Sequence, residues 1–285
     1  MQFSQSVLVC LFLLFLLAAC APSANGLERV LESGVLRVGM DASFPPFEYV
    51  DGAGNLVGFD VDLAREMAAQ LGVEAQFVAN LPYDGLYDAL TADRVDVVIS
   101  ALYVDPNRTA DFAYSTAYFD AGQVLVAQAA GIEGPHSLAG QTLAVEFGSA
   151  GDVEARTWTQ RLAGLTVLPC QTADEALARV ASGEADAALV DHLSALAWLD
   201  GQNDLRIVGG MVTREPYAAA TRRENRQLLR ALNDAIATMV NDGRMAALQA
   251  RWFRVRETES RVRSEAAKAR PTDQVPAPGT GRRSR

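Results

Sequence analysis

Hydrophobic and polar positions alternate along the chain in a way that predicts short strands separated by helices. Apolar runs of strand length lie at residues 35–39, 73–79, 95–100, 142–146, 165–168 and 186–190. Segments with apolar side chains at helical spacing lie at residues 60–71, 83–93, 224–243 and 244–253. Strands that alternate with helices predict α/β sheets with crossover helices.

Local signals place several helix ends. Asp60 precedes a run of apolar positions with helical spacing, which predicts an N-cap, and Gly72 ends the same helix. Thr172 with Glu175 three residues later has the spacing of a capping box. These signals divide the middle of the chain into elements of ordinary length.

The N-terminus has the pattern of a secretory leader. Residues 7–19 are apolar, which is too short to span a bilayer but suits a signal peptide. The sequence Leu17-Ala18-Ala19-Cys20 resembles the lipobox of bacterial lipoproteins, which implies cleavage before Cys20 and a lipid on its sulfur. We therefore expect a signal at 1–19 and a tether at 20–34. An ordinary secretory signal or a membrane anchor is the alternative. Residues 1–6 contain no Lys or Arg, which departs from the pattern of such leaders.

Charge and composition exclude some classes of protein. The formal net charge is −10, and the basic residues concentrate after residue 255, so the folded part lacks the basic patch of a nucleic-acid binder. Apart from the leader, no long apolar run indicates a membrane-spanning protein. Residues 256–285 are charged and then rich in Pro and Gly, so we expect a disordered tail that is solvated or touches anionic lipid.

The residues that usually carry metal or redox chemistry are sparse. Cys10 would leave with the signal and Cys20 would be modified, so Cys170 would remain alone as a small core residue. His136 and His192, the two histidines, lack ligand spacing to another His or Cys. We expect no metal and no cofactor.

The chain contains a weak internal repeat. Residues 86–100 (LYDALTADRVDVVIS) and residues 178–190 (ARVASGEADAALV) both place an aspartate, Asp96 or Asp186, before a buried strand. Open α/β sheets bind ligands at the carboxyl ends of their strands. Two such units facing each other would enclose a cleft between two lobes.

Seven segments in sequence order resemble the periplasmic amino-acid-binding proteins that serve ABC importers. The segments are LRVGMDASFPPFEY, GNLVGFDVDLAREMAAQLG, YDGLYDALTADRVDVVIS, VDPNRTADFAYSTAYF, LAGQTLAVEFGSAG, ADAALVD and MVNDGRMAALQARWF. The resemblance spans residues 36–253 and implies a type II periplasmic-binding-protein fold, with two α/β lobes that close like a hinged trap. It places lobe 1 at 35–122 plus 218–255, lobe 2 at 123–217, and the crossovers near 121–127 and 216–221.

The resemblance also implies contacts to the ligand's backbone groups. Arg108 matches the carboxylate clamp, and Asp105-Pro106 reads as the N-cap and first position of a short helix that presents it. A surface arginine is the alternative. Asp191 matches the aspartate that binds the ammonium, or is simply a helix N-cap. The remaining matches use main-chain groups and are Ala101, Tyr103, Gly148, Ser149 and Ala150. Tyr103 replaces a small hydroxyl residue, so only its backbone contact is carried over, and Ala150 replaces a threonine, so one hydroxyl contact is missing. Ser149 either takes the place of that contact or simply caps the helix.

The side-chain pocket is carried over in the same way. Phe44 and Phe59 match two aromatic walls, with ordinary core residues as the alternative, and Asp41, Ser100 and Glu146 match its far end. Carboxylates and aromatic faces favour a cationic or hydrogen-donating tip. We therefore expect a basic or polar free amino acid (arginine, lysine, ornithine or glutamine) rather than glutamate or aspartate.

The resemblance as a whole implies a monomeric, lipid-anchored binding protein outside the cytoplasm that delivers its amino acid to an ABC permease. The main alternative is an enzyme of the cyclohexadienyl dehydratase kind, which resembles these proteins and would use Glu146 as a general acid. A third alternative is an extracellular sensor or the binding lobe of a cell-wall lytic enzyme, but no catalytic domain follows residue 253.

Overall fold

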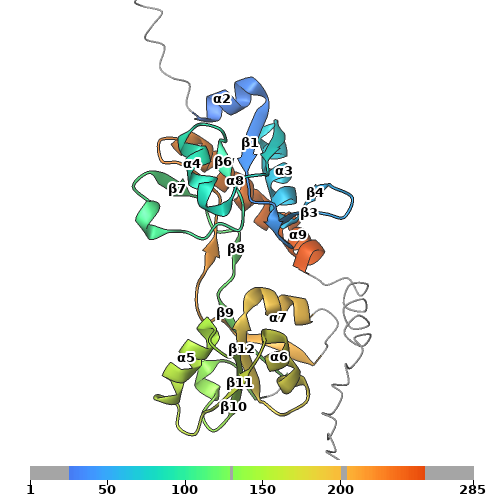
Figure 1. The fold of residues 1–285 in the computed structure, drawn as a ribbon, viewed down its shortest axis with the longest axis vertical. Helices are drawn as coiled ribbons and strands as arrows, with labels where there is room; N and C mark the ends of the chain where they lie inside the picture. The colour runs from blue at the N-terminus through green and yellow to red at the C-terminus, as the bar shows by residue number, and fades with distance from the viewer. Residues whose placement is uncertain (1–25, 129–130, 200–203, 254–285) are drawn as a thin grey trace, which may run out of the picture.

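The computed structural model describes residues 26–128, 131–199 and 204–253, which form two α/β lobes connected by short strands (Figure 1). The fold is therefore the two-lobed arrangement expected from the sequence. The signal at 1–19, Cys20 and the tail at 256–285 lie outside the described residues. Within those residues, no helix has both the length and the apolar content that a membrane span requires.

The first lobe is built on a five-stranded sheet. Its strands, in spatial order, are β5 (Glu74–Val78), β1 (Val35–Gly39), β6 (Val97–Val98), β15 (Ala220–Arg222) and β7 (Phe112–Tyr114). β1 runs parallel to β5 and β6, whereas β15 is antiparallel to β6 and β7. The apolar run at 95–100 is buried throughout, as expected, although only two of its residues form the strand.

Helices and a small sheet cover this lobe. The helices are α2 (Gly26–Ser33), α3 (Phe59–Leu71), α4 (Leu86–Thr91), α8 (Arg226–Asn241) and α9 (Arg244–Phe253). A three-stranded sheet contains β2 (Ser43–Phe44), β3 (Glu48–Val50) and β4 (Leu56–Val57). Helices α3, α8 and α9 pack together against one face of the main sheet.

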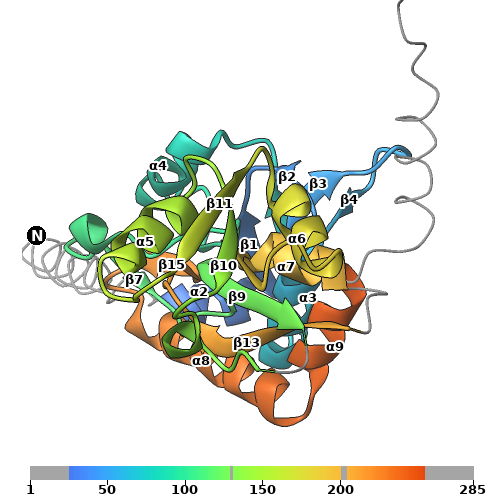
Figure 2. The same cartoon turned by 90° about the horizontal axis from the view of Figure 1, so that it is seen from below.

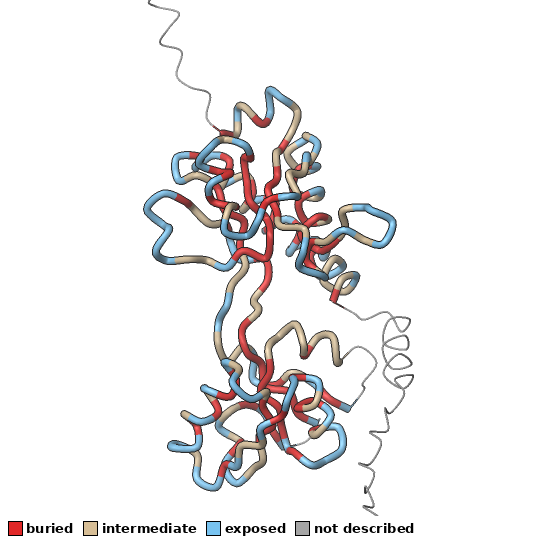
Figure 3. Tube along the Cα trace, in the orientation of Figure 1, coloured by how far each residue is buried: buried red, intermediate tan, exposed pale blue. Residues whose placement is uncertain are grey.

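The second lobe has its own five-stranded sheet. Its strands, in spatial order, are β11 (Thr166–Cys170), β10 (Thr142–Glu146), β12 (Ala187–Asp191), β9 (Gln123–Gln128) and β13 (Leu205–Met211). Helix α5 (Ala150–Thr159) covers one face, and α6 (Ala173–Ala181) and α7 (His192–Leu199) cover the other (Figure 2). Because successive side chains in a strand point to opposite faces, Ala188 and Val190 pack with α6 while Ala187 and Leu189 pack with α5. Buried residues thus form a separate core in each lobe (Figure 3).

The lobes are joined where β8 (Phe119–Asp120) pairs with β14 (Pro216–Tyr217). The Asp120 carboxylate holds this connection, because its Oδ1 accepts hydrogen bonds from the amides of Gly122 (3.1 Å) and Glu215 (2.8 Å). A Cβ on Gly122 would lie 2.2 Å from the carbonyl oxygen of Thr213, so only glycine fits there. The first crossover therefore begins at β8, slightly before the expected 121–127, and β9 belongs wholly to the second sheet.

Two local expectations were wrong. The expected tether at 20–34 includes a helix, α2, whose Val30 is buried in the core of the first lobe. Asp60 is not the N-cap of α3, since Gly58 occupies that position and Asp60 lies in the first turn without any exposed surface. Thr172 is confirmed as the N-cap of α6, since its Oγ1 accepts from the Glu175 amide at 3.1 Å, while the Glu175 side chain accepts from the Gln171 amide at 2.9 Å.

The two aspartates of the internal repeat, Asp96 and Asp186, stabilise the sheets. Asp96 Oδ2 accepts from the Arg37 amide of β1 at 2.9 Å, and Asp186 Oδ2 accepts from the Thr142 amide of β10 at 2.7 Å. Each aspartate therefore ties the strand that follows it to the neighbouring parallel strand, at the middle of β1 and at the first residue of β10. The aspartates of the two units therefore hold the sheets together and do not themselves line the cavities described below.

Candidate functional site

Two neighbouring cavities lie on the first lobe where its strands end. The larger, of about 300 Å³, is lined by Asp41, Ser43, Phe44, Glu48, Tyr83, Ser100, Ala101 and Tyr217. The smaller, of about 120 Å³, is lined by Tyr83, Asp84, Tyr87, Leu102, Tyr103, Asp105 and Arg108. Tyr83 borders both cavities. Together they bring six of the residues expected from the sequence into one region.

Arg108 is presented by a single turn of 3-10 helix, Pro106–Arg108. Asp105 is its N-cap, as expected, and accepts from the Asn107 amide at 2.9 Å. The Arg108 guanidinium carbon lies 4.4 Å from the centroid of the Tyr87 ring, and its Nε lies 3.6 Å from Asp105 Oδ2. The side chain is 48% exposed, so the stacked guanidinium is held in place while solvent still reaches it.

Opposite charge lines the larger cavity. Asp41 follows β1 and its Oδ2 accepts from the Tyr83 amide at 3.1 Å, which ties the carboxylate to the residue shared by both cavities. The Asp41 amide donates to Ser100 Oγ at 2.9 Å. The smaller cavity therefore has the Arg108 guanidinium with Asp84 and Asp105 beside it, and the larger cavity has the Asp41 carboxylate.

The C-terminal end of β6 and the N-terminal end of α3 form the floor between the two cavities. Ala101 has φ of 41°, a left-handed conformation that costs energy for a residue other than glycine. Its amide donates to Asp60 Oδ2 at 2.6 Å, which holds the backbone in that conformation. Ser100 Oγ donates to Glu48 Oε1 at 2.8 Å. The ligand-facing backbone is thus fixed from below by two acidic side chains.

The sequence did not identify Glu48 as a residue of the site, and it predicted Asp60 as a helix N-cap. Glu48 is 1% exposed and Asp60 has no exposed surface. Burial, together with the neighbouring Asp60 charge, raises the pKa of Glu48. Burial also raises the pKa of Asp60, while hydrogen bonds from Ala101 and Tyr118 act in the opposite direction. The position of Glu48 beside the aromatic residues Phe44 and Phe47 is the sequence feature that could have identified it as a site residue.

Only one of the two expected aromatic walls lines a cavity. Phe44 is 43% exposed and stacks on Phe47 with a centroid distance of 5.6 Å. Phe59 is completely buried and packs against Phe253 with centroids 4.9 Å apart, so it is a core residue here. Tyr83 and Tyr217 provide the other aromatic surfaces of the larger cavity. Tyr103 is 51% exposed and forms an isolated bridge with Tyr217.

The residues expected from the second lobe lie apart from these cavities. Asp191 Oδ1 accepts from the Ser194 amide at 2.8 Å at the start of α7, so its capping role is realised. Ser149 caps α5 by accepting from the Asp152 amide at 3.2 Å. Glu146 is the last residue of β10, and Ala150 is the first residue of α5, which follows that strand.

Two of the expected carboxylate donors already have partners. The Gly148 amide donates to Asp152 Oδ2 at 3.1 Å, and the Ser149 amide donates to the Glu146 carbonyl at 3.1 Å. In this conformation both amides are therefore occupied within the second lobe, and their binding to a ligand stays a prediction. A ligand would have to displace these internal hydrogen bonds.

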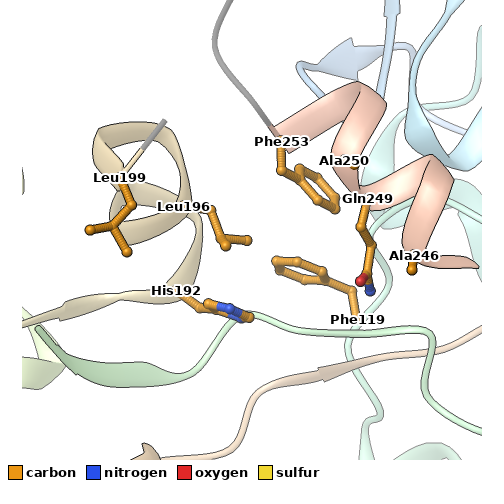
Figure 4. Close-up of a pocket in the computed structure, with 8 residues that line it drawn as sticks. All are labelled: Phe119, His192, Leu196, Leu199, Ala246, Gln249, Ala250 and Phe253. Carbon is orange, nitrogen blue, oxygen red and sulfur yellow. The ribbon is translucent and has the colours of Figure 1, made fainter. Parts of the chain in front are cut away.

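A larger hollow of about 470 Å³ lies between α7 and α9 (Figure 4). Its lining is mostly apolar, with His192 stacked on Phe119 at 5.2 Å and its Nδ1 2.8 Å from the Asp120 carbonyl oxygen. None of the residues expected to bind ligand lines it. Because charged groups converge on the two smaller cavities and not here, we assign the candidate site to those cavities.

No group of three or more His, Cys, Asp or Glu side chains within the described ranges could hold a metal ion. Cys170 is 2% exposed, and burial raises the pKa of its thiol. Its surroundings are those of an inert core cysteine.

The two-lobed fold, with a charged cleft on one lobe and a hinge of paired strands, defines a solute-binding protein. Residues 36–255 match the family of bacterial extracellular solute-binding proteins, family 3. The chain belongs to this family. The match covers both sheets and the connection between them.

Characterised relatives share most of the length of the chain. The L-cystine-binding protein TcyJ of Escherichia coli is 34% identical over 230 residues, covering 80% of this chain and 85% of the relative. The arginine-binding extracellular protein ArtP of Bacillus subtilis is 28% identical, covering 87% and 96%.

Solved structures agree on the fold. The L-cystine solute receptor of Neisseria gonorrhoeae, in an unliganded open conformation, superimposes with a TM-score of 0.69 at 27% identity, covering 82% of this chain and all of the receptor. An ancestral cyclohexadienyl dehydratase superimposes with a TM-score of 0.70 at 24% identity, covering 82% and 99%. The second likeness concerns the fold alone.

Proposed function

We propose that the protein captures a free amino acid between its two lobes and delivers it to an ABC importer. The observation that carries this proposal is the pairing of Arg108 and Asp41 in adjoining cavities that share Tyr83. A guanidinium can bind a carboxylate through two parallel hydrogen bonds, while a carboxylate at the other end favours a cationic or donating group. An amino acid with such a side chain carries both groups in one molecule.

The lining of the larger cavity narrows the ligand class. Asp41 is the more exposed of the two acidic residues that line the cavity, since Glu48 is 1% exposed, and Phe44, Tyr83 and Tyr217 supply aromatic faces. This lining favours basic or polar amino acids over glutamate and aspartate. Cystine satisfies the same requirement, since its second amino group is cationic, and relatives of the chain bind L-cystine or arginine according to their names.

Lobe closure would complete the site. In the described conformation every residue that lines the two cavities belongs to the first lobe or to β14. We propose that closure brings in Asp191 and the start of α5, with lobe 1 at 35–122 plus 218–255 and lobe 2 at 123–217. A ligand that binds both lobes shifts the population toward the closed form by its extra affinity for that form.

A thermal-shift screen of the purified protein against free amino acids tests the proposal. Arginine, lysine, ornithine, glutamine, histidine and cystine are compared with glutamate, aspartate, prephenate and arogenate. A bound ligand raises the melting temperature by mass action. Agmatine and cadaverine serve as matched controls, because they lack the carboxylate that Arg108 would hold and are expected to give no shift.

The outcomes separate the alternatives. A shift with one or more basic or polar amino acids supports the binding protein and identifies its ligand. A response only to prephenate or arogenate, with turnover that is lost in Glu146→Gln, would favour the dehydratase alternative. If no amino acid raises the melting temperature, the proposal is wrong.

We also propose that Cys20 carries a lipid, that the mature protein is a monomer outside the cytoplasm, and that the closed form docks on a permease. Replacement of Cys20 by Ser should move the protein from the membrane fraction to the soluble fraction of cells. Uptake of the identified amino acid by cells should fall when Arg108 is replaced by Ala while the permease is intact.

A further inference from the structure

Two buried acids lie side by side beneath the candidate site. Glu48 comes from β3 and lines the larger cavity, and Asp60 comes from the first turn of α3. The Asp60 amide donates to the carbonyl of Phe47, the residue before Glu48, at 2.8 Å, and each carboxyl group affects the pKa of the other. Among the described residues, no ion pair includes either carboxylate, so a basic side chain does not balance their charge.

Hydrogen bonds from neighbours use one oxygen of each acid. Glu48 Oε1 accepts from Ser100 Oγ at 2.8 Å. Asp60 Oδ2 accepts from the Ala101 amide at 2.6 Å and from the Tyr118 hydroxyl at 2.9 Å. The other two oxygens, Glu48 Oε2 and Asp60 Oδ1, are buried and receive no donor from the described part of the chain.

Counting protons gives one protonation state that satisfies every atom. With no proton, two buried carboxylates would repel each other and leave two acceptors without donors. With two protons, one O–H would have no acceptor, because Ala101 and Tyr118 already donate to Asp60. With one proton, a hydroxyl at Glu48 Oε2 or at Asp60 Oδ1 donates to the other acid and all four oxygens are satisfied. The two donors to Asp60 Oδ2 favour the proton on Glu48.

We propose that Glu48 and Asp60 hold one shared proton and act together as positioning residues for the ligand-facing segment Ser100–Ala101. Asp60 fixes the left-handed conformation of Ala101 through its amide. Glu48 orients the Ser100 hydroxyl, which in turn accepts from the Asp41 amide at 2.9 Å. The pair thereby connects the two sides of the cavity floor.

The groups that face the pair are acidic or neutral. They are Asp41 from the loop after β1, Tyr83 from the turn before α4, Tyr118 from the segment before β8, and Tyr217 from β14. The Asp41 carboxylate favours retention of the proton by the pair, whereas the hydrogen bond from Tyr118 to Asp60 acts against it. None of these groups supplies a positive charge that would displace the proton.

Stability should therefore depend on pH with a definite sign. The folded pair keeps a proton that the two carboxyls of an unfolded chain lose above about pH 5. The folded state then binds more protons than the unfolded state, so stability falls as pH rises. One proton corresponds to a tenfold change in the folded-to-unfolded ratio for each pH unit, or about 1.4 kcal/mol.

Amide variants measure this proton. In Glu48→Gln, the amide oxygen can accept from Ser100 and the amide NH₂ can donate to Asp60 without a titrating proton. We expect the stability of this variant, relative to the native protein, to rise tenfold per pH unit between pH 6 and 8 in urea unfolding. Glu74→Gln, an exposed residue of β5, is the matched control and should leave the slope unchanged.

A second variant provides the same test if Glu48→Gln does not fold. In Asp60→Asn, the amide oxygen accepts from Ala101 and Tyr118 and the NH₂ donates to an ionised Glu48, so the same slope is expected. The double variant should be less stable at pH 7 than either single variant, because two NH₂ groups would then face each other. If the stability differences stay within twofold from pH 6 to 8, or if the double variant is the most stable, the shared proton does not exist.

The positioning role rests on the proposed function and has its own readout. With the amino acid identified by the screen, Glu48→Ala should weaken binding at least tenfold, and Glu48→Gln should restore part of that loss. Equal affinities for the two variants would contradict the positioning role. Because the unfolding experiment uses no ligand, failure of the proposed function leaves the test of the shared proton intact.

Discussion

Replacement of Arg108 by Ala gives the sharpest test of the candidate site. In the unliganded protein this side chain is 48% exposed, stacks on Tyr87 at 4.4 Å and lies 3.6 Å from Asp105. Exposed contacts of these kinds contribute at most about 1 kcal/mol each to stability. The variant should therefore fold, and its free energy of unfolding should fall by no more than about 2 kcal/mol.

The loss of ligand affinity should be much larger. When the lobes close, a buried ligand carboxylate would lose its only guanidinium partner, which costs roughly 2–5 kcal/mol. This range corresponds to about thirtyfold to several thousandfold in the dissociation constant. Lysine at position 108 keeps the charge but cannot form two parallel hydrogen bonds, so Arg108→Lys should fall between the native protein and the alanine variant.

Isothermal titration calorimetry with the amino acid found in the screen measures these losses. Arg65 is the matched control, because it is 52% exposed, pairs with Asp62 at 3.1 Å and stacks over Phe77 at 5.5 Å. Arg65→Ala should lose similar local contacts and keep its affinity. A loss below about tenfold for Arg108→Ala, or an equal loss for the two variants, would remove Arg108 from the site.

Further predictions concern the core, the second-lobe side of the proposed site and the buried cysteine. Phe59→Ala should lower the free energy of unfolding by roughly 3–5 kcal/mol in urea, because the ring is completely buried. Gly58→Ala should destabilise by at least about 2 kcal/mol, since φ is 140° and a Cβ would lie 2.0 Å from the Phe47 carbonyl oxygen; an unchanged melting temperature would contradict this. Asp191→Asn should keep stability, because the amide oxygen can still cap α7, but should weaken ligand binding by roughly 1.5–3 kcal/mol by calorimetry. Cys170 should react with a thiol probe at pH 7.5 only at the rate of unfolding, because burial raises the pKa of its thiol; fast labelling of the folded protein would refute its core role.

Signals that act over a few residues were sufficient for most elements. Thr172 with Glu175 opens α6 as predicted, and Asp105-Pro106 opens the turn that presents Arg108. Strands β10, β11 and β12 of the second lobe also lie within two residues of the predicted apolar runs, whereas β9 and β13 were not predicted. These outcomes depend on backbone hydrogen bonds and apolar spacing within one element, so the sequence contains the necessary information.

Partners distant in sequence decided the rest. Asp60 has the sequence signature of a helix cap, yet it lies beneath Ala101, 41 positions further along the chain. Phe59 matched a pocket wall but was drawn into the core by Phe253. The sequence by itself determined the elements and the family, because those follow from local propensity and order along the chain. Only the tertiary structure decided which acids are buried together and which rings face solvent, because burial depends on packing between segments that no local pattern specifies.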